Sequence, residues 1–286
     1  MSLVVALERL AEKPLPVIAG GTDFYPALLD KAAPEEVIDV TQLDELKGIT
    51  LNGSVWRIGA AATWTDLLRA DLPLAFDALK AAAREVGSVQ IQNRATLVGN
   101  ICEPSPAADG VPALLALDAM VELQRAGATR QVPLSEFVTG VRTTLRQADE
   151  LVTAITIPEP SATERSEFAK LGSRTYLVIS IAMLAVHLDT NDQGMIKRCS
   201  LAVGSCSPVA QRLTALETTL HGMPIKTDMD IQHIKQQIQN YPFDELSPID
   251  DVRGSADYRL SVVRSVLQRS LISVIQQFNS AASAPL

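Results

Sequence analysis

Apolar positions follow helical and strand spacings in turn along the first part of the chain. Apolar residues recur at intervals of three and four from Leu3 to Leu10, which predicts a helix that two prolines then end. Short apolar runs predict strands over 17–19 and 37–40, with a helix between them over 25–31. A strand, a helix and a second strand in this order predict a small α/β unit with parallel strands.

The pattern changes at the Asn52–Gly53 turn, where a hairpin leads into a new apolar run. We therefore predict one lobe over residues 1–53 and a second lobe over 54–160. In the second lobe, Thr65 is predicted to cap a short helix, and Gly87 is predicted to end a longer one.

A polar connector near residue 160 separates the second lobe from a third, which spans 161–286. The strands predicted on either side of this connector cover 121–124, 151–157, 168–171, 178–188 and 195–203. The last three are predicted to form a small antiparallel sheet, with two helices packed on it, the longer from Leu260 to Phe278. Three arginines lie off that apolar stripe and are predicted to face solvent or a partner: Arg259, Arg264 and Arg269.

The composition predicts a globular protein. Hydrophobic residues make up 47% of the 286 residues and charged residues 20%, which suits two or three lobes with a sizeable core. The net charge is −8 and no basic run occurs, so nucleic acid and anionic membranes are not expected partners. The longest apolar run, 177–188, is interrupted and too short to span a bilayer, so we expect no membrane insertion.

The cysteines and histidines favour neither a disulfide framework nor a metal site. Cys102, Cys199 and Cys206 are far apart, and no CxxC or Cys/His cluster accompanies them. We therefore expect a cytoplasmic protein that holds no metal with its own side chains. The motifs of serine hydrolases, zinc proteases and nucleotide-binding phosphate loops are missing, and His187 falls within a predicted strand.

Two backbone-rich turns are the strongest candidates for ligand binding. The first, 17–23, reads VIAGGTD and places two glycines before a helix start, where backbone N–H groups can bind an anion. The alternative is an ordinary turn capped by Thr22. The second turn, 96–100, contains a threonine, a glycine and an asparagine, and Asp109 follows it as either a helix cap or a ligand. Such a pair of turns suits a cofactor with two linked phosphates.

These turns belong to a set of seven sequence stretches in a characteristic order. The stretches are AGGTD at 19–23, RIGAAATWTDL at 57–67, QIQNRATLVGNI at 90–101, SPAADGVPALLALDA at 105–119, AITIP at 154–158, FAKLGSR at 168–174 and RGSADYR at 253–259. On this set, the chain resembles the FAD-binding (medium) subunit of the molybdenum hydroxylases, the xanthine dehydrogenase and carbon monoxide dehydrogenase flavoprotein family.

The resemblance implies an α+β fold, with a two-lobed FAD-binding domain of the PCMH/vanillyl-alcohol-oxidase type and a C-terminal small antiparallel sheet with helices. It implies that the two lobes hold FAD between them without a covalent bond. The residues that it assigns to the cofactor are Val17, Ile18, Ala19, Gly20, Gly21, Thr22, Asp23 and Phe24 in the first pyrophosphate turn, Thr96, Val98, Gly99 and Asn100 in the second, and Val86, Ser105, Asp109, Val152 and Lys170.

Lys170 matches the basic residue that the family places near the isoalloxazine ring, where a cation stabilises negative charge on the reduced flavin. The alternative is a lysine on the surface of a strand. The chain departs from the family at Val98 and Ala95, where glycine is usual, at Gln92, where arginine is common, and at Glu103. We expect Val98 either to adopt an ordinary β conformation or to reshape the second turn, because valine resists positive φ.

The implied function is electron transfer within a multi-subunit molybdenum-containing dehydrogenase. Electrons would pass from a [2Fe-2S] small subunit through FAD to an external acceptor, and a large subunit would carry the molybdenum cofactor. A dimer of heterotrimers is expected. The alternatives are a stand-alone flavin reductase or oxidase, and a noncatalytic scaffold that has lost FAD. The sequence does not select NAD, oxygen or a quinone as acceptor.

Overall fold

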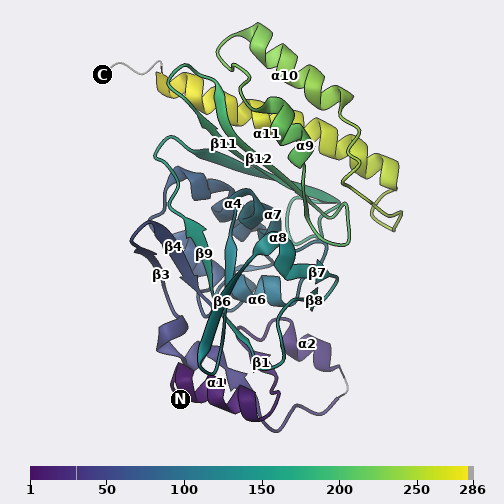
Figure 1. The fold of residues 1–286 in the computed structure, drawn as a ribbon. Coiled ribbons are helices and arrows are strands. Elements are labelled where there is room, and N and C mark those ends of the chain that lie inside the picture. The colour runs from purple at the N-terminus through teal and green to yellow at the C-terminus, as the bar shows by residue number, and fades with distance from the viewer. Residues whose placement is uncertain (30, 283–286) are drawn as a thin grey trace. The chain divides into compact units, whose positions relative to one another are not determined.

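The computed structural model describes residues 1–29 and 31–282, which form two compact units (Figure 1). The N-terminal unit comprises 1–70, 86–105 and 118–159. The C-terminal unit comprises 71–85, 106–117 and the chain from Pro160 onward. Each unit has its own sheet and its own buried core.

A five-stranded antiparallel sheet forms the centre of the N-terminal unit, in the order β3-β4-β9-β5-β6. Its strands are β3 (Ile49–Asn52), β4 (Val55–Gly59), β5 (Met120–Arg125), β6 (Ala128–Pro133) and β9 (Leu151–Pro158). The middle strand, β9, is buried along nearly its whole length, as its run of apolar and β-branched residues predicts. The predicted hairpin is confirmed, since Asn52 pairs with Val55 and Gly53 has a φ of 62°.

The predicted parallel strand pair is also present in this unit. Strand β1 (Val17–Ile18) pairs in parallel with β2 (Ile38–Asp39). Helix α1 (Leu3–Glu12) precedes them, and α2 (Phe24–Leu28) lies between them in the chain. The prediction extended this second helix to residue 31, but Leu29 has a φ of 48°, which ends the helix. Asp30, which the prediction included, lies outside the described residues.

Short helices complete the N-terminal unit: η1 (Val40–Gln42), η2 (Asp44–Leu46), α3 (Trp64–Arg69), α5 (Val89–Gln92), α6 (Leu97–Cys102) and α8 (Leu134–Phe137), with a small hairpin of β7 (Val138–Gly140) and β8 (Thr143–Thr144).

The predicted cap of α3 is wrong by two residues. Thr63, not Thr65, accepts a hydrogen bond from the backbone N–H of Asp66, whose carboxylate in turn accepts one from the N–H of Thr63. This reciprocal capping box satisfies two backbone donors at the helix start.

The C-terminal unit contains the predicted antiparallel sheet, in the order β10-β11-β12-β13. Its elements are η3 (Leu74–Phe76), α4 (Asp77–Glu85), α7 (Gly110–Ala116), β10 (Arg165–Leu171), β11 (Ala182–Thr190), β12 (Ile196–Gly204), β13 (Gln211–Arg212), α9 (Thr214–Leu220), α10 (Asp228–Asn240) and α11 (Ala256–Ala282). Helix α11 crosses one face of the sheet and α4 and α7 lie on the other (Figure 1). Strand β11 is therefore buried on both faces.

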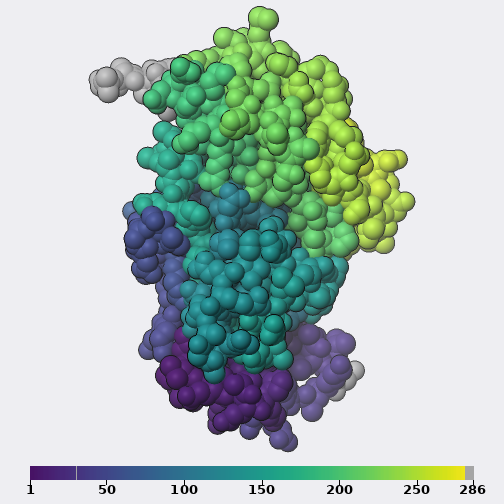
Figure 2. Space-filling model, in the orientation of Figure 1, coloured from purple at the N-terminus to yellow at the C-terminus, as the bar shows by residue number. Residues whose placement is uncertain are grey.

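Burial on two faces explains the continuous apolar run that the sequence shows in this region. The apolar stripe of α11, which includes Val263, Leu267 and Leu271, is fully buried against the sheet. The outer sides of α10 and α11 form the surface of this unit, where they appear green and yellow (Figure 2). Strand β11 begins at Ala182 rather than at the predicted residue 178.

One of the three arginines beside the α11 stripe does not face solvent, contrary to our prediction. Arg259 is only 3% exposed. It donates hydrogen bonds to the carbonyl oxygens of Ile181 and Ser205 and to the carboxylate of Asp251. Its buried charge is therefore paired and ties the start of α11 to the sheet. Arg269 is exposed as predicted.

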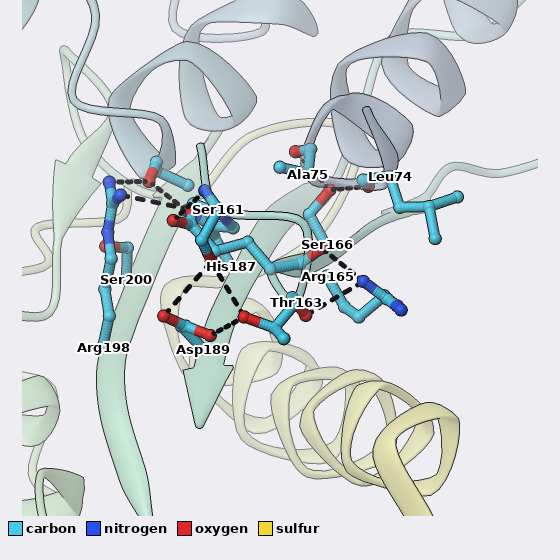
Figure 3. A network of polar contacts seen from close by, with 12 residues as sticks. Leu74, Ala75, Ser161, Thr163, Arg165, Ser166, His187, Asp189, Arg198 and Ser200 are labelled. Carbon is cyan, nitrogen blue, oxygen red and sulfur yellow. Dashed lines mark hydrogen bonds and ion pairs between the residues drawn. The ribbon is translucent and has the colours of Figure 1, made fainter. Parts of the chain in front are cut away.

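A buried polar network anchors the connector onto the C-terminal sheet (Figure 3). The carboxylate of Glu164 lies 2.7 Å from Nε2 of His187 and 3.3 Å from the guanidinium of Arg198. Nδ1 of His187 lies 3.0 Å from the carbonyl oxygen of Ala116. Thr163 donates a hydrogen bond to Asp189. His187 lies in strand β11, as predicted, and it also holds the connector, β11 and the end of α7 together.

We predict that Glu164 makes the C-terminal unit sensitive to acid. Burial alone would raise the pKa of Glu164, but hydrogen bonds from His187 and from the backbone of Ser161 outweigh it and lower the pKa to about 2. A carboxylate with a lowered pKa stabilises the fold above its ordinary pKa, and this stabilisation is lost as pH falls from 4.5 towards 2. The loss corresponds to about 3 kcal/mol of unfolding free energy.

The measurement is the unfolding free energy of wild type and Glu164→Gln between pH 7 and pH 2. The variant is expected to be less stable at neutral pH and to have a flatter acid limb. Asp192→Asn, at an exposed position in the turn before β12, is the matched control and should follow the wild-type curve. Parallel curves for wild type and Glu164→Gln would contradict the prediction.

Candidate functional site

The first glycine turn packs directly on the loop before the second. A Cβ added to Gly20 would lie 1.9 Å from the carbonyl oxygen of Arg94 and 2.8 Å from Cα of Ala95, so only glycine fits there. Gly21 adopts a φ of 75°, a conformation that favours glycine. The two segments that we predicted to bind phosphate are therefore in contact within the N-terminal unit.

Thr22 does not cap the helix that follows this turn. The residue at the N-cap of α2 is Asp23, and its side chain makes no capping hydrogen bond. The part of the alternative interpretation that makes Thr22 the cap is therefore wrong. What holds the turn is its close approach to the neighbouring backbone.

The second turn is the first turn of helix α6. Thr96 is its N-cap, and its hydroxyl accepts a hydrogen bond of 3.0 Å from the backbone N–H of Gly99. Val98 lies inside the helix and is 4% exposed. The helical conformation suits valine, and Val98 has no positive φ. Of the two alternatives that we expected, the β conformation is therefore wrong, and a reshaped second turn stays a prediction. The side chain of Val98 packs in the core of the unit.

Asn100 carries an unpaired polar atom in this region. Its Oδ1 is buried, and among the described residues no hydrogen-bond partner reaches it. A buried amide oxygen without a partner costs about 1–3 kcal/mol. A ligand that donates a hydrogen bond to Oδ1 would remove this cost.

Asp109 and Lys170 form a buried ion pair in the C-terminal unit. Nζ of Lys170 lies 2.8 Å from Oδ2 of Asp109, and the hydroxyl of Ser180 donates to Oδ1 at 3.0 Å. The two side chains are 7% and 10% exposed, so Lys170 is not the surface lysine of the alternative interpretation. Asp109 stands at the N-cap of α7 but makes no capping bond with its side chain. Burial raises the pKa of Asp109, and Lys170 opposes this.

The remaining predicted residues lie in the N-terminal unit. Val86 directly follows α4 and is half-buried, Ser105 is exposed after α6, and Val152 is buried on β9 opposite Leu123. The structure thus brings the two glycine turns together in one unit, and Asp109 with Lys170 in the other. Ser180 was missed because nothing in its local sequence marks it as a partner of Asp109.

The described residues hold no group of three or more His, Cys, Asp or Glu side chains that could bind a metal ion. No helix in that part of the chain is long and apolar enough to cross a membrane. The N-terminal unit offers a glycine cradle that a Cβ would fill and a buried oxygen without a donor, and the C-terminal unit offers a cation held by a carboxylate. These groups fit a phosphate-bearing organic cofactor such as FAD.

Comparison with known proteins agrees with this fit. Residues 2–160 match the family described as the FAD binding domain in molybdopterin dehydrogenase, and residues 167–274 match the CO dehydrogenase flavoprotein C-terminal domain. The chain belongs to this flavoprotein family. The predicted family, the fold and the FAD cofactor are thereby confirmed.

Individual relatives match this flavoprotein over almost their full length. The nicotinate dehydrogenase FAD-subunit of Eubacterium barkeri is 30% identical, with 97% of this chain and 94% of the relative covered. The xanthine dehydrogenase FAD-binding subunit of Escherichia coli O157:H7 is 30% identical, covering 100% and 96%. A carbon monoxide dehydrogenase structure from Hydrogenophaga pseudoflava superposes with a TM-score of 0.82 at 28% identity, covering 94% and 93%.

We predict that breaking the Asp109–Lys170 pair destabilises the C-terminal unit more than removing both charges. Lys170→Met leaves a buried carboxylate without its cation, which costs about 3–5 kcal/mol of unfolding free energy. Asp109→Asn with Lys170→Met removes both charges and is expected to recover most of that loss. Chemical denaturation of the two single variants and the double variant measures the coupling. Additive losses would show that the pair does not act as a unit.

We also predict that Gly20→Ala separates the first turn from residues 94 and 95. The added Cβ would overlap backbone atoms that cannot rotate away, so the unfolding free energy should fall by about 1–3 kcal/mol. Gly140→Ala is the matched control, because its nearest neighbour would lie at an ordinary 3.7 Å. A variant at position 20 as stable as the control would contradict the close packing.

Proposed function

We propose that the flavoprotein binds FAD noncovalently and passes electrons from a [2Fe-2S] partner subunit to an external acceptor. The first pyrophosphate turn would be Val17, Ile18, Ala19, Gly20, Gly21, Thr22, Asp23 and Phe24, and the second would be Thr96, Val98, Gly99 and Asn100. Further contacts would come from Val86, Ser105, Asp109, Val152 and Lys170. The observation that carries the proposal is the glycine cradle at Gly20, packed on the loop that precedes α6.

When bound, FAD accepts electrons from iron-sulfur groups and delivers them to a separate acceptor. The protein's residues bind and orient it. Backbone N–H groups of the glycine turns would hold the diphosphate, and Asn100 would accept a hydrogen bond at its unpaired Oδ1. Asp109 fixes the ammonium group of Lys170, which would stabilise negative charge on the reduced ring.

The assembly and its location are further parts of the proposal. Relatives are named as medium chains or subunits of dehydrogenases and hydroxylases, among them a carbon monoxide dehydrogenase medium chain and a nicotine 6-hydroxylase medium subunit. We propose a cytoplasmic complex with a [2Fe-2S] small subunit and a large subunit that carries the molybdenum cofactor, arranged as a dimer of heterotrimers. Lobes at 1–53, 54–160 and 161–286 are retained as a proposed division.

The test of FAD binding is the thermal stability of the purified chain with and without added FAD. A ligand that binds only the folded state at about 100 times its Kd adds about 2.7 kcal/mol of stability. Asn100→Ala is expected to weaken this response without destabilising the FAD-free protein, because the substitution removes an unpaired buried oxygen. Wild-type protein that is colourless and insensitive to FAD would support the scaffold alternative instead.

Copurification distinguishes the electron-transfer subunit from a stand-alone flavin enzyme. The complex is expected to contain a cysteine-rich small subunit and a much larger subunit. A fully active isolated chain would contradict the proposed assembly.

A further inference from the structure

The tip of a hairpin in the N-terminal unit joins two loops that are distant in sequence. Arg142 lies between β7 and β8, and its guanidinium donates to the carboxylate of Asp23 at 2.9 Å and to that of Glu103 at 3.2 Å. Asp23 belongs to the first glycine turn, and Glu103 directly follows α6, which carries the second. One cation therefore spans the two segments that we propose to hold the diphosphate.

The backbone of Arg142 is held in the same place. Its N–H donates a 2.8 Å hydrogen bond to the carbonyl oxygen of Pro104, next to Glu103. Its φ is 54°, a left-handed conformation that a residue with a side chain adopts only when its surroundings hold it there. The main chain therefore helps to fix the direction of the Arg142 side chain and the position of its guanidinium.

The charges around Arg142 matter because the proposed ligand is an anion. Without Arg142, the carboxylates of Asp23 and Glu103 would stand uncompensated beside the proposed diphosphate-binding turns and would repel it. Arg142 itself is about half exposed, and exposed ion pairs contribute little to folding. Removing Arg142 should therefore weaken ligand binding more than it lowers the unfolding free energy.

We propose that Arg142 is a positioning residue, which holds the two glycine turns in register and neutralises Asp23 and Glu103 so that the FAD diphosphate binds between those turns. This role rests on the proposed function. It requires no contact between Arg142 and FAD. The proposal differs from direct phosphate recognition because it predicts that removing a carboxylate compensates for removing the arginine.

The experiment measures FAD affinity of the full chain by flavin fluorescence at low salt. Arg142→Gln is expected to weaken FAD binding about tenfold. Arg142→Lys keeps the charge but reaches one carboxylate less well, so it is expected to recover part of the loss. Arg142→Gln with Glu103→Gln is expected to bind FAD more tightly than Arg142→Gln alone. Arg125→Gln is the matched control, since Arg125 is similarly exposed and pairs with Asp149 at 3.8 Å.

Measuring FAD affinity at high salt and the stability of the FAD-free variant distinguishes electrostatic positioning from a simple loss of structure. The difference between wild type and Arg142→Gln should shrink in 1 M salt, where charges more than about 3 Å apart are screened. The urea midpoint of the FAD-free variant should match that of wild type. Binding by Arg142→Gln equal to wild type, or no recovery in the double variant, would overturn the proposal. Failure of wild type to bind FAD would instead refute the proposed function.

Discussion

The close approach of Gly20 to the backbone of Arg94 and Ala95 is the constraint on which the proposed binding region depends. Two loops separated by more than seventy residues can present backbone N–H groups to one small ligand when their main chains lie close together, as these do. A side chain at Gly20 would keep them apart. The glycine is therefore required for packing between loops, and access of the turn to an anion follows from that packing. Thr96 then fixes the second loop by capping α6.

The C-terminal unit satisfies a different constraint, because its sheet is covered by helices on both faces. The charged side chains buried in this layer are paired, and the pairs join segments that the apolar packing alone would not fix. His187 and Glu164 attach the connector to β11, and Arg259 attaches the start of α11 to the sheet. Asp109 and Lys170 join α7 to β10 in the same way. The buried charges thus specify how the layers meet.

The local sequence pattern was enough to predict much of the fold. It was not enough to predict which side chains pair with residues far away in the sequence. The parallel strand pair, the hairpin at Gly53 and the C-terminal sheet follow from periodicity and turn chemistry, and the structure has all three. The burial of Arg259 could not be predicted, because its acceptors include Ile181, 78 residues away. Lys170 likewise depends on Asp109, 61 residues away. The sequence left the conformation of Val98 open between a β conformation and a reshaped turn, and the structure has Val98 inside helix α6.

The charge distribution explains how an acidic protein can hold a dianionic diphosphate. With a net charge of −8, the chain offers no general positive field to attract the ligand. Binding must then rely on local dipoles and on neutralising each nearby carboxylate. Lys170 is placed against Asp109, and Arg142 against Asp23 and Glu103. Within the N-terminal unit, Arg142 compensates the two carboxylates beside the glycine turns, which favours the proposed binding of phosphate by their backbone N–H groups. Arg142 thus acts through the two carboxylates that it compensates.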